Sequence, residues 1–411
     1  MNKKISLGIT ISLIAIGCAI TFVLTWTVSL NIYNSKIASS EKFEGVYEKL
    51  KEMDAIVRSN YINISSVDDD ALQGSIIDGY VKGIGDPYAY YLAPSSYYEQ
   101  QQTTNGVVNG AGFEAEPDGS GYLKITRIYK GGSAESNGVR VGDVITEINS
   151  RSLLSMTASE AQDQLSGETG TKLSLRLVRD GELVSVTLIR QQIDIESVTY
   201  EMLDNAIGYI RIITFNAKTS DQFSSALDHI RSRGAKALII DVRQNGGGLV
   251  SALKPMLNRI ISSAVVAWAE YTDKTRRTLI ETDSEEHLDI PIALLVDGGT
   301  ASAAELFAVA LRDEQGARLI GTQTYGKAVM QSTFEFADGG AFTLTTATII
   351  PSKSLSYNGV GLKPDFAVEL PAGTTPGQLT KESDTQLLKA IEILTPEITV
   401  PEPPEESSNQ Q

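Results

Sequence analysis

The stretch "IPIALLVDGGTASAAELFAVALRDE", residues 290–314, decides the fold. It opens with a continuous apolar run, turns at Gly298-Gly299, and continues in a helical pattern from about Ser302. A strand that is apolar at every position is buried on both faces, which is typical of a parallel sheet covered by helices. Upstream, "AKALIIDV" is followed by "RQNGGG" and "LVSALKPMLNRI", which repeats the order of strand, glycine-rich turn and helix. We therefore predict an α/β core over residues 193–375, with further strands in "ARLIG", "STFEF" and "AFTLTTATII".

Both glycine-rich turns follow the carboxyl ends of their predicted strands, where open α/β sheets place ligand sites. Ser302 and Glu305 have the S-x-x-E form of a capping box, so Ser302 could be only a helix cap. If the turn at Gly246-Gly247-Gly248 is a neighbour, its amides and the N–H of Ala303 could converge on one oxygen. That convergence is what an oxyanion hole requires. The local pattern alone leaves cap and nucleophile open.

A nucleophilic serine needs a base, and histidine is scarce. The two histidines, His229 and His287, lie in polar surroundings and are expected on the surface, which disfavours a Ser-His-Asp triad or a zinc site. Lys327, in "TYGKAVMQ", lies on a glycine-bearing turn between two predicted strands. Burial disfavours the ammonium, so a desolvated lysine could accept the serine proton. Gln331 could hold that amine, and neither a metal nor a cofactor is expected.

Residues 105–192 show β-sheet signals of a different kind. "TKLSLRLVRDGELVSVTLIR" alternates apolar and polar residues around an Asp180-Gly181 turn, which predicts a hairpin. The order of glycine loop, strands, short helix and hairpin resembles a PDZ domain. Where PDZ domains carry the loop that receives a peptide's terminal carboxylate, this chain has "NGAGF", namely Asn109, Gly110, Ala111, Gly112 and Phe113. The alternative is a glycine-bearing loop without a ligand.

The amino-terminal residues predict a membrane anchor over residues 1–35. Lys3-Lys4 precede an apolar run that has no charged residue until Lys36, and about 20 apolar residues are enough to cross a bilayer. Positive charge before the span places the rest of the chain outside the cytoplasm. A cleaved signal peptide is the alternative. A lipoprotein signal at Cys18, the single cysteine, is disfavoured because apolar sequence continues well past it.

Charge and composition indicate which partners the protein can bind and how its remaining segments are structured. A net charge of −16 argues against binding nucleic acid, because that affinity comes largely from lysine and arginine. Helical spacing predicts helices within residues 36–104 and a C-terminal helix over residues 376–394. The tail, residues 395–411, is rich in proline, glutamate and serine and is predicted to be disordered.

Several of these motifs occur together in one known family. "DVRQNGGG", "VDGGTASAAEL" and "YGKAVMQ", with a PDZ-like module ahead of them and a closing "GVGLKPD", resemble the C-terminal processing peptidases, or tail-specific proteases. The resemblance covers about residues 41–370. It implies Ser302 as nucleophile, Lys327 as base and Gln331 as the residue that orients the lysine. It further implies oxyanion amides from Ala303 and from Gly246 or Gly247.

The chain departs from the family pattern at two positions. Ala304 stands where a serine is often expected, and Ala328 where a glycine often follows the lysine. Neither departure removes a nucleophile, base or amide.

We therefore predict a mixed α/β multidomain protein. A crotonase-like α/β peptidase core would carry an inserted PDZ-like domain and N-terminal helices, preceded by one transmembrane helix. Its expected function is that of a serine endopeptidase anchored in the cell membrane, with its catalytic part extracytoplasmic and its protein substrates bound by their C-termini. The alternatives are a PDZ-bearing binding protein with an inert core and a crotonase-like acyl hydrolase. A homo-oligomer or an activating partner is left open.

Overall fold

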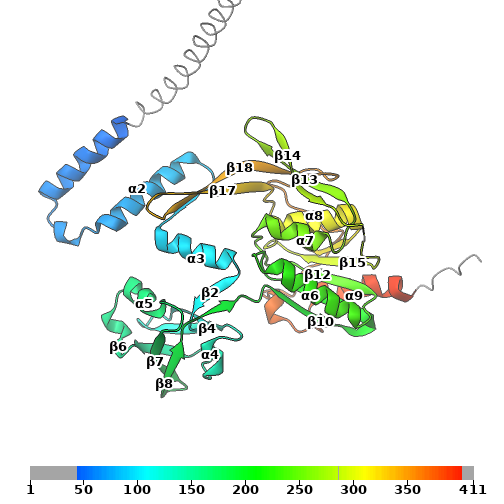
Figure 1. Cartoon of the computed structure of the whole chain (residues 1–411), viewed down its shortest axis with the longest axis horizontal. Coiled ribbons are helices and arrows are strands. Elements are labelled where there is room, and N and C mark those ends of the chain that lie inside the picture. The colour runs from blue at the N-terminus through cyan, green and yellow to red at the C-terminus, as the bar shows by residue number, and fades with distance from the viewer. Residues whose placement is uncertain (1–43, 286, 400–411) are drawn as a thin grey trace, which may run out of the picture. The chain divides into compact units, whose positions relative to one another are not determined.

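The computed structural model describes residues 44–285 and 287–399 (Figure 1). The predicted anchor, residues 1–35, lies outside this range. Across the described part of the chain, no helix combines the length and the apolar character that a bilayer crossing needs. The chain divides into two compact units, residues 1–77 and 78–411.

The described part of the first unit is helical, as its apolar spacing predicts. Residues 44–60 form a helix, and a short 3-10 turn, η1 (Ile64–Ser66), leads to α2 (Asp69–Ile84), whose first half belongs to this unit. Arg58 joins the two helices by hydrogen bonds of 2.8 Å to Asp54 and 2.8 Å to Asp69. α2 ends where Gly85 takes a left-handed φ of 77° ahead of Pro87. Asp86, the residue before Pro87, is also disfavoured in the helical region, so the helix does not resume beyond Gly85.

The predicted PDZ-like module is a sheet in the order β3-β4-β5-β7-β8, with β6 paired to β5. Asp180 and Gly181 have φ values of 52° and 85°, the two positive angles of a type I′ turn, so the predicted hairpin is confirmed. Its core is a separate cluster that includes Ile125, Ile145 and Leu173. The strands are β3 (Phe113–Pro117), β4 (Leu123–Ile128), β5 (Val144–Ile148), β6 (Arg151–Ser152), β7 (Lys172–Arg179) and β8 (Glu182–Ile189), and the helices are α4 (Ser133–Ser136), η2 (Leu153–Ser155) and α5 (Ala158–Leu165).

A two-stranded ladder lies at the start and end of this module. It pairs β2 (Val107–Gly110) with β9 (Gln191–Asp194) in antiparallel register. Val108, Tyr129, Ile193 and Ile195 form a small apolar cluster beside it. The chain therefore enters and leaves the module through adjacent strands.

The main sheet has the order β10-β11-β12-β15-β16-β19, with β10 antiparallel to β11 and every other pair parallel. Every residue of β12 and of β15 is buried, which confirms strands covered on both faces. Alternate side chains pack against α6, α7 and α8 on one face and against α9 on the other. The elements are β10 (Val198–Met202), η3 (Asp204–Ala206), β11 (Ile207–Ile212), α6 (Thr219–Ser232), β12 (Ala237–Asp241), η4 (Val250–Ala252), α7 (Leu253–Leu257), β15 (Ile292–Val296), α8 (Ala303–Gln315), β16 (Arg318–Gly321), β19 (Phe366–Ala367), η5 (Pro376–Gln378) and α9 (Thr385–Thr399).

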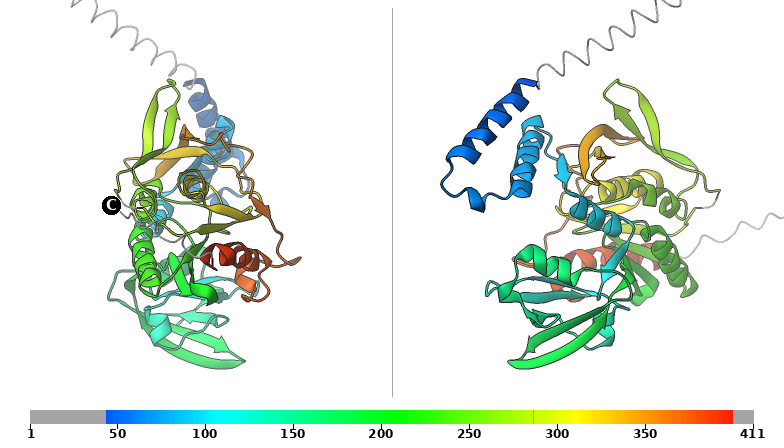
Figure 2. Two further views of the ribbon diagram at one scale, coloured as in Figure 1. Left: turned by 90° about the vertical axis from the view of Figure 1, so that its right-hand side faces the viewer. Right: turned by 60° about the vertical axis from the view of Figure 1, so that its left-hand side comes forward.

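A second sheet is built on the long strand β18 (Ala341–Pro351). β17 (Val329–Glu335) pairs along one edge of β18, and β1 (Tyr90–Leu92) and β13 (Ala264–Tyr271) pair along the other. β14 (Arg276–Thr282) pairs with β13, and Figure 2 shows this hairpin in yellow-green extending beyond the rest of the sheet. Between β1 and β2 lies α3 (Pro94–Thr104). The pairing of β1 brings the chain after α2 next to the strands that follow Lys327.

Two helical predictions are corrected. The stretch "LVSALKPMLNRI" forms only η4 and the five-residue α7. Pro255 has no N–H to donate to the carbonyl four residues earlier, so the turn before it, η4, is a 3-10 helix and not the start of an α-helix. The C-terminal helix begins at Thr385 instead of residue 376, and it continues to Thr399 although a disordered tail is predicted from residue 395. Ile398 packs with the cluster under the main sheet, and this burial outweighs the composition of the tail. Residues 400–411 lie outside the described range.

Candidate active site

Ser302 is the N-cap residue of α8, as its sequence pattern predicts. Its φ of 56° and ψ of −118° lie in a region that residues with a side chain rarely adopt. The N–H of Ser302 donates to Glu305 Oε2 at 3.0 Å, within a capping box. Backbone strain of this kind costs about 1–3 kcal/mol and is concentrated at functional sites. Ser302 therefore starts the helix from a sharp, strained turn.

The glycine-rich turn after β12 lies directly against this serine turn. A Cβ on Gly247 would come within 2.8 Å of the Ala301 oxygen and 2.9 Å of the Ala303 nitrogen, and its φ is 101°. The N–H of Ala301 donates to the carbonyl of Asn245 at 2.9 Å. Only glycine permits this close approach of two backbones. The structure thus brings together the two turns that the sequence places after separate strands.

The two candidate glycines, Gly246 and Gly247, differ in whether their N–H groups are free to bind an oxyanion. The Gly247 N–H donates to Asn245 Oδ1 at 2.9 Å and is already used within the turn. Gly246 is exposed, and a Cβ placed on it would meet nothing within 4 Å. Ala303 opens α8, where N–H groups have no partner inside the helix and the dipole is positive. Gly246 is therefore a better oxyanion candidate than Gly247, together with Ala303.

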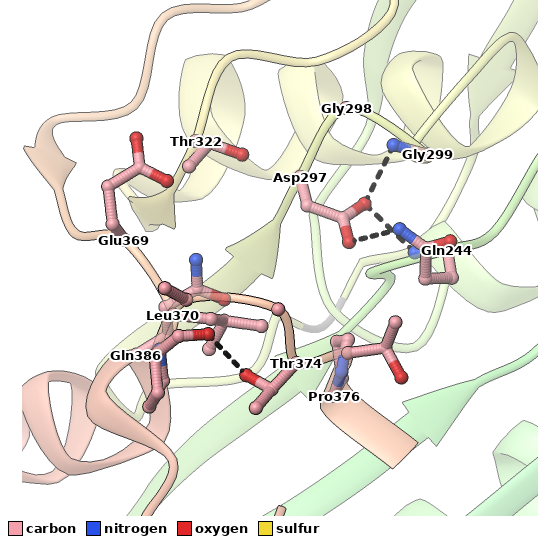
Figure 3. A pocket seen from close by; sticks show the side chains of 14 residues that line it. Gln244, Asp297, Gly298, Gly299, Thr322, Glu369, Leu370, Thr374, Pro376 and Gln386 are labelled. Carbon is pink, nitrogen blue, oxygen red and sulfur yellow. Dashed lines mark hydrogen bonds between the residues drawn. The ribbon is translucent and has the colours of Figure 1, made fainter. Parts of the chain in front are cut away.

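Asp297 ties the two turns together from the side. Its Oδ1 accepts the N–H groups of Gln244 and Gly299, each at 2.9 Å, and its Oδ2 accepts Gln244 Nε2 at 2.7 Å (Figure 3). The carboxylate lies in the wall of a cavity of about 420 Å³. Other lining residues include Thr322, Glu369, Gln386 and residues 370–376.

A buried charge cluster supports the glycine turn from behind. The guanidinium of Arg243, whose side chain is 2% exposed, binds Asp241 at 2.6 Å and Asp384 at 2.8 Å. Burial opposes this charge, but the two carboxylates raise the pKa of Arg243 above its ordinary value. The Tyr209 hydroxyl donates to Asp241 at 2.7 Å. Asp384 immediately precedes α9, so the C-terminal helix is anchored to the residue just before Gln244.

Glu305 joins the serine turn to the lysine turn. Its buried carboxylate accepts the N–H groups of Ser302 at 3.0 Å, Lys327 at 2.8 Å and Gly326 at 2.7 Å, and the hydroxyl of Thr324 at 2.5 Å. Sequence reasoning assigned Glu305 only to the cap. Its second role was missed because Lys327 is 22 positions away and the pattern that signals a cap is local. The backbones of Ser302 and Lys327 therefore share one carboxylate.

The amine of Lys327 is half-buried and lies over an aromatic ring. Its Nζ is 4.5 Å from the centroid of the Tyr88 ring. Burial lowers the pKa of Lys327, and the charge of Asp86 partly opposes that shift. Across residues 44–399 as described, no hydrogen bond joins this amine to the Ser302 hydroxyl or to Gln331. Gln331 instead donates to Thr345 Oγ1 at 3.3 Å.

The "NGAGF" loop connects β2 to β3 of the PDZ-like module. Gly110 pairs with Gln191 in the ladder, Ala111 is buried, and Phe113 packs against the module's core. Gly112 has a φ of 94°, and a Cβ there would lie 2.8 Å from the Gly132 Cα. Asn109 turns its amide toward α3, donating to Gln102 at 3.1 Å and Tyr98 at 3.2 Å.

The two histidines contribute nothing to these turns. His229 and His287 are exposed, as predicted, and His229 packs on Tyr200. Within the described ranges, no group of His, Cys, Asp and Glu side chains could hold a metal ion.

Comparison with known proteins matches two segments of the chain. Residues 206–368 match peptidase family S41, and residues 124–179 match the PDZ domain. The carboxy-terminal processing protease CtpA of Bacillus subtilis strain 168 is 30% identical over 374 residues, which cover 90% of this chain and 78% of that protein. A CtpA-like serine protease of Staphylococcus aureus strain N315 is 31% identical over 361 residues, covering 87% of this chain and 72% of that protein.

The chain belongs to peptidase family S41. It is a C-terminal processing serine peptidase with a PDZ domain, so the predicted family is confirmed. Among solved structures, the photosystem II D1 C-terminal processing protease aligns with a TM-score of 0.46 at 24% identity, covering 84% of this chain and 90% of that one.

The candidate functional residues of this S41 peptidase do not all lie within the two matched segments. Residues 206–368 include the serine, glycine and lysine turns, whereas the match to the PDZ domain begins at residue 124, after the "NGAGF" loop. Asp86 and Tyr88 lie outside both segments. No local pattern singled them out, because they reach the lysine only through the pairing of β1 with β18.

Proposed function

We propose that this S41 peptidase is a membrane-anchored endopeptidase that cleaves with a Ser302-Lys327 dyad. The main support for this proposal is that the Glu305 carboxylate binds the backbone N–H groups of both residues. It places them at one edge of the core, beside the amino terminus of α8. A strained serine turn at a positive helix end is suited to acyl transfer.

In the reaction, Ser302 Oγ attacks the scissile carbonyl while the neutral amine of Lys327 takes its proton. The N–H groups of Ala303 and Gly246 stabilise the oxyanion of the tetrahedral intermediate. The Lys327 ammonium then protonates the leaving amine, and the acyl-enzyme is hydrolysed by a water that the amine activates. Burial favours this chemistry because it lowers the pKa of Lys327.

The dyad requires a side-chain movement before the first step. The Lys327 amine, which lies 4.5 Å from the Tyr88 ring centroid, has to come within hydrogen-bond reach of the Ser302 hydroxyl. Gln331 would orient it there after exchanging its hydrogen bond to Thr345. Apo enzymes commonly hold such contacts long or misaligned until substrate is bound.

The other parts of the chain would select and locate the substrate. The PDZ domain, proposed over residues 105–192, would bind C-termini through residues 109–113 and recruit them to a crotonase-like core over residues 193–375. Residues 1–35 would anchor the peptidase in the cell membrane with its catalytic part extracytoplasmic. Deleting residues 105–192 should abolish or deregulate cleavage, and unchanged kinetics on every substrate would remove the PDZ domain from the mechanism. Loss of residues 1–35 should move the protein from the membrane fraction to the supernatant.

The dyad is tested with the full chain in detergent, using an unfolded protein with an apolar C-terminus as substrate. Ser302→Ala and Lys327→Ala should abolish cleavage while leaving tail binding and the melting temperature unchanged. Lys353→Ala, at an exposed lysine paired with Glu314, is the matched control and should cleave normally. Labelling with a serine-reactive phosphonate should require both Ser302 and Lys327. Cleavage by Lys327→Ala at the wild-type rate would overturn the dyad.

A further inference from the structure

The segment between α2 and β1 brings two side chains to Lys327. Its Nζ lies 4.5 Å from the Tyr88 ring centroid, and the charge of Asp86 also acts on it. The next strand, β1, is paired with β18 from Tyr90 to Leu92, which fixes this segment against the sheet that carries Gln331. The contact is therefore built into the fold of the core.

Asp86 is held in place as a carboxylate. Its oxygens accept the N–H of Thr345 at 2.9 Å, the Thr345 hydroxyl at 3.1 Å and the N–H of Tyr88 at 3.0 Å. Burial alone would raise the pKa of Asp86, but these hydrogen bonds outweigh it and hold the pKa below its ordinary value. A fixed negative charge thus acts on the Lys327 amine at neutral pH.

Tyr88 presents the face of a neutral ring. Burial raises the pKa of Tyr88, and the neighbouring hydroxyl of Tyr325 and the carboxylates of Glu305 and Asp86 act in the same direction. The phenol therefore stays protonated. The face of an aromatic ring attracts an ammonium and has no such attraction for a neutral amine.

We propose that Asp86 and Tyr88 form a holding site that keeps Lys327 protonated and away from Ser302 until its side chain moves. The holding site is defined by its interactions with Lys327. Only its expected effect on cleavage rests on the proposed function. Asp86 and Tyr88 are positioning residues that act through Lys327. Other titratable groups near the lysine turn include Glu305, which binds its backbone, Tyr325 and the buried Tyr357.

The holding site is linked to Gln331 through one hydroxyl. Thr345 Oγ1 donates to Asp86 and accepts the Gln331 amide. The residue expected to orient the lysine is thus engaged by the same network that holds the lysine back. Release of Lys327 from the ring and release of Gln331 from Thr345 would together assemble the active arrangement.

The direct test measures protonation of Lys327 without using catalysis. The full chain in detergent, carrying Ser302→Ala to prevent self-cleavage, is treated briefly with a small acylating reagent between pH 6 and 11. Mass spectrometry then follows labelling of the peptide that contains Lys327. Asp86→Asn and Tyr88→Leu should each shift the labelling midpoint to lower pH by about half a unit, because each removes an interaction that favours the ammonium. Tyr88→Phe keeps the ring and should retain the midpoint.

A second readout connects the holding site to cleavage. With Ser302 restored, the acid limb of the pH profile of kcat/KM should move to lower pH in Asp86→Asn and Tyr88→Leu. At a pH below that limb, a half-unit shift corresponds to about threefold more cleavage, since the neutral fraction of the amine rises. Tyr88→Phe should follow the wild-type profile.

The outcomes separate the two proposals. Labelling midpoints that coincide in all variants, or that move to higher pH, would overturn the holding site even if Lys327→Ala is inactive. Shifted midpoints with an unmoved profile would support the holding site and remove Lys327 as the base. If Asp86→Asn does not fold, as judged by thermal melting, the comparison of Tyr88→Leu with Tyr88→Phe decides the question alone.

Discussion

The serine turn and the lysine turn are fixed to different degrees. Around Ser302, backbone atoms are held by Glu305, by Asn245 and by close contact with Gly247. The backbone of Lys327 is held as firmly, through the same Glu305. Its amine, however, is held by an aromatic ring and a nearby charge.

This difference assigns separate tasks to the two turns. The turn that carries Ser302, the proposed nucleophile, is pre-organised by backbone contacts to Glu305, Asn245 and Gly247. The proposed base, Lys327, depends on a flexible side chain whose position can change at low cost. In the proposed mechanism, the Lys327 amine is therefore the one group that still has to be placed, and the following variants test that proposal.

The largest effect is expected from Glu305→Gln, which removes the element common to both turns. Glutamine offers one oxygen where three N–H groups and a hydroxyl now donate, and its NH₂ would face a donor. Because each carboxylate oxygen accepts two of these donors, two hydrogen bonds are lost; at about 1.5–3 kcal/mol each, kcat/KM should fall at least about a hundredfold. Glu314→Gln, on the same helix but paired with Lys353, is the control. A loss of less than tenfold would show that the turns are positioned by something else.

Gly247→Ala tests the contact between the glycine turn and the serine turn. Its Cβ would meet backbone atoms at 2.8 and 2.9 Å, so the serine turn must shift. Misplacement by about 1 Å can cost about a hundredfold in rate. Gly246→Ala keeps its N–H and has open space, so kcat should change by less than about threefold. Equal losses in the two variants would contradict the predicted asymmetry.

Asp384→Asn tests the support behind the glycine turn. It removes one carboxylate from a buried pair, and breaking such a pair costs about 3–5 kcal/mol of unfolding free energy. Because the asparagine side chain would retain one oxygen for Arg243, we expect the lower end of that range and about a tenfold loss of kcat. Urea unfolding measures the loss of unfolding free energy. Glu201→Gln, in an exposed pair with Lys381, should change stability by less than about 1 kcal/mol.

The smallest effect is expected from a variant that alters only the side-chain contacts near Lys327. Thr345→Val removes the hydroxyl between Asp86 and Gln331 but keeps the N–H that binds Asp86. The variant loses both hydroxyl bonds, of which only the one to Gln331 involves a proposed site residue; at about 1 kcal/mol for that bond, kcat should change about fivefold with KM unchanged. Thr343→Val, on the same strand and bonded to Thr333, should leave kcat unchanged. An effect as large as that of Glu305→Gln would mean that Thr345 positions more than a side chain.

Local sequence patterns predicted those helices, strands and turns whose buried residues follow the regular spacing of a single element. The continuous apolar runs of β12 and β15, the helical spacing of α8 and the Asp-Gly hairpin turn are of this kind. The same patterns predicted a glycine-rich turn after each of those strands and left open whether the two turns are neighbours. They failed where a single residue or a distant contact prevailed, as at Pro255 in α7 and Ile398 in α9.

By itself, the sequence determined the family, the strand-turn-helix units and the identity of the candidate nucleophile and base. Only the tertiary structure decided which groups surround them. Asp86 lies 259 positions from Thr345, Arg243 lies 141 from Asp384, and Glu305 lies 22 from Lys327. The physical reason is that local periodicity reports which face of an element is buried. The protonation and aim of a side chain depend on charges and rings that the folded chain brings to it from elsewhere.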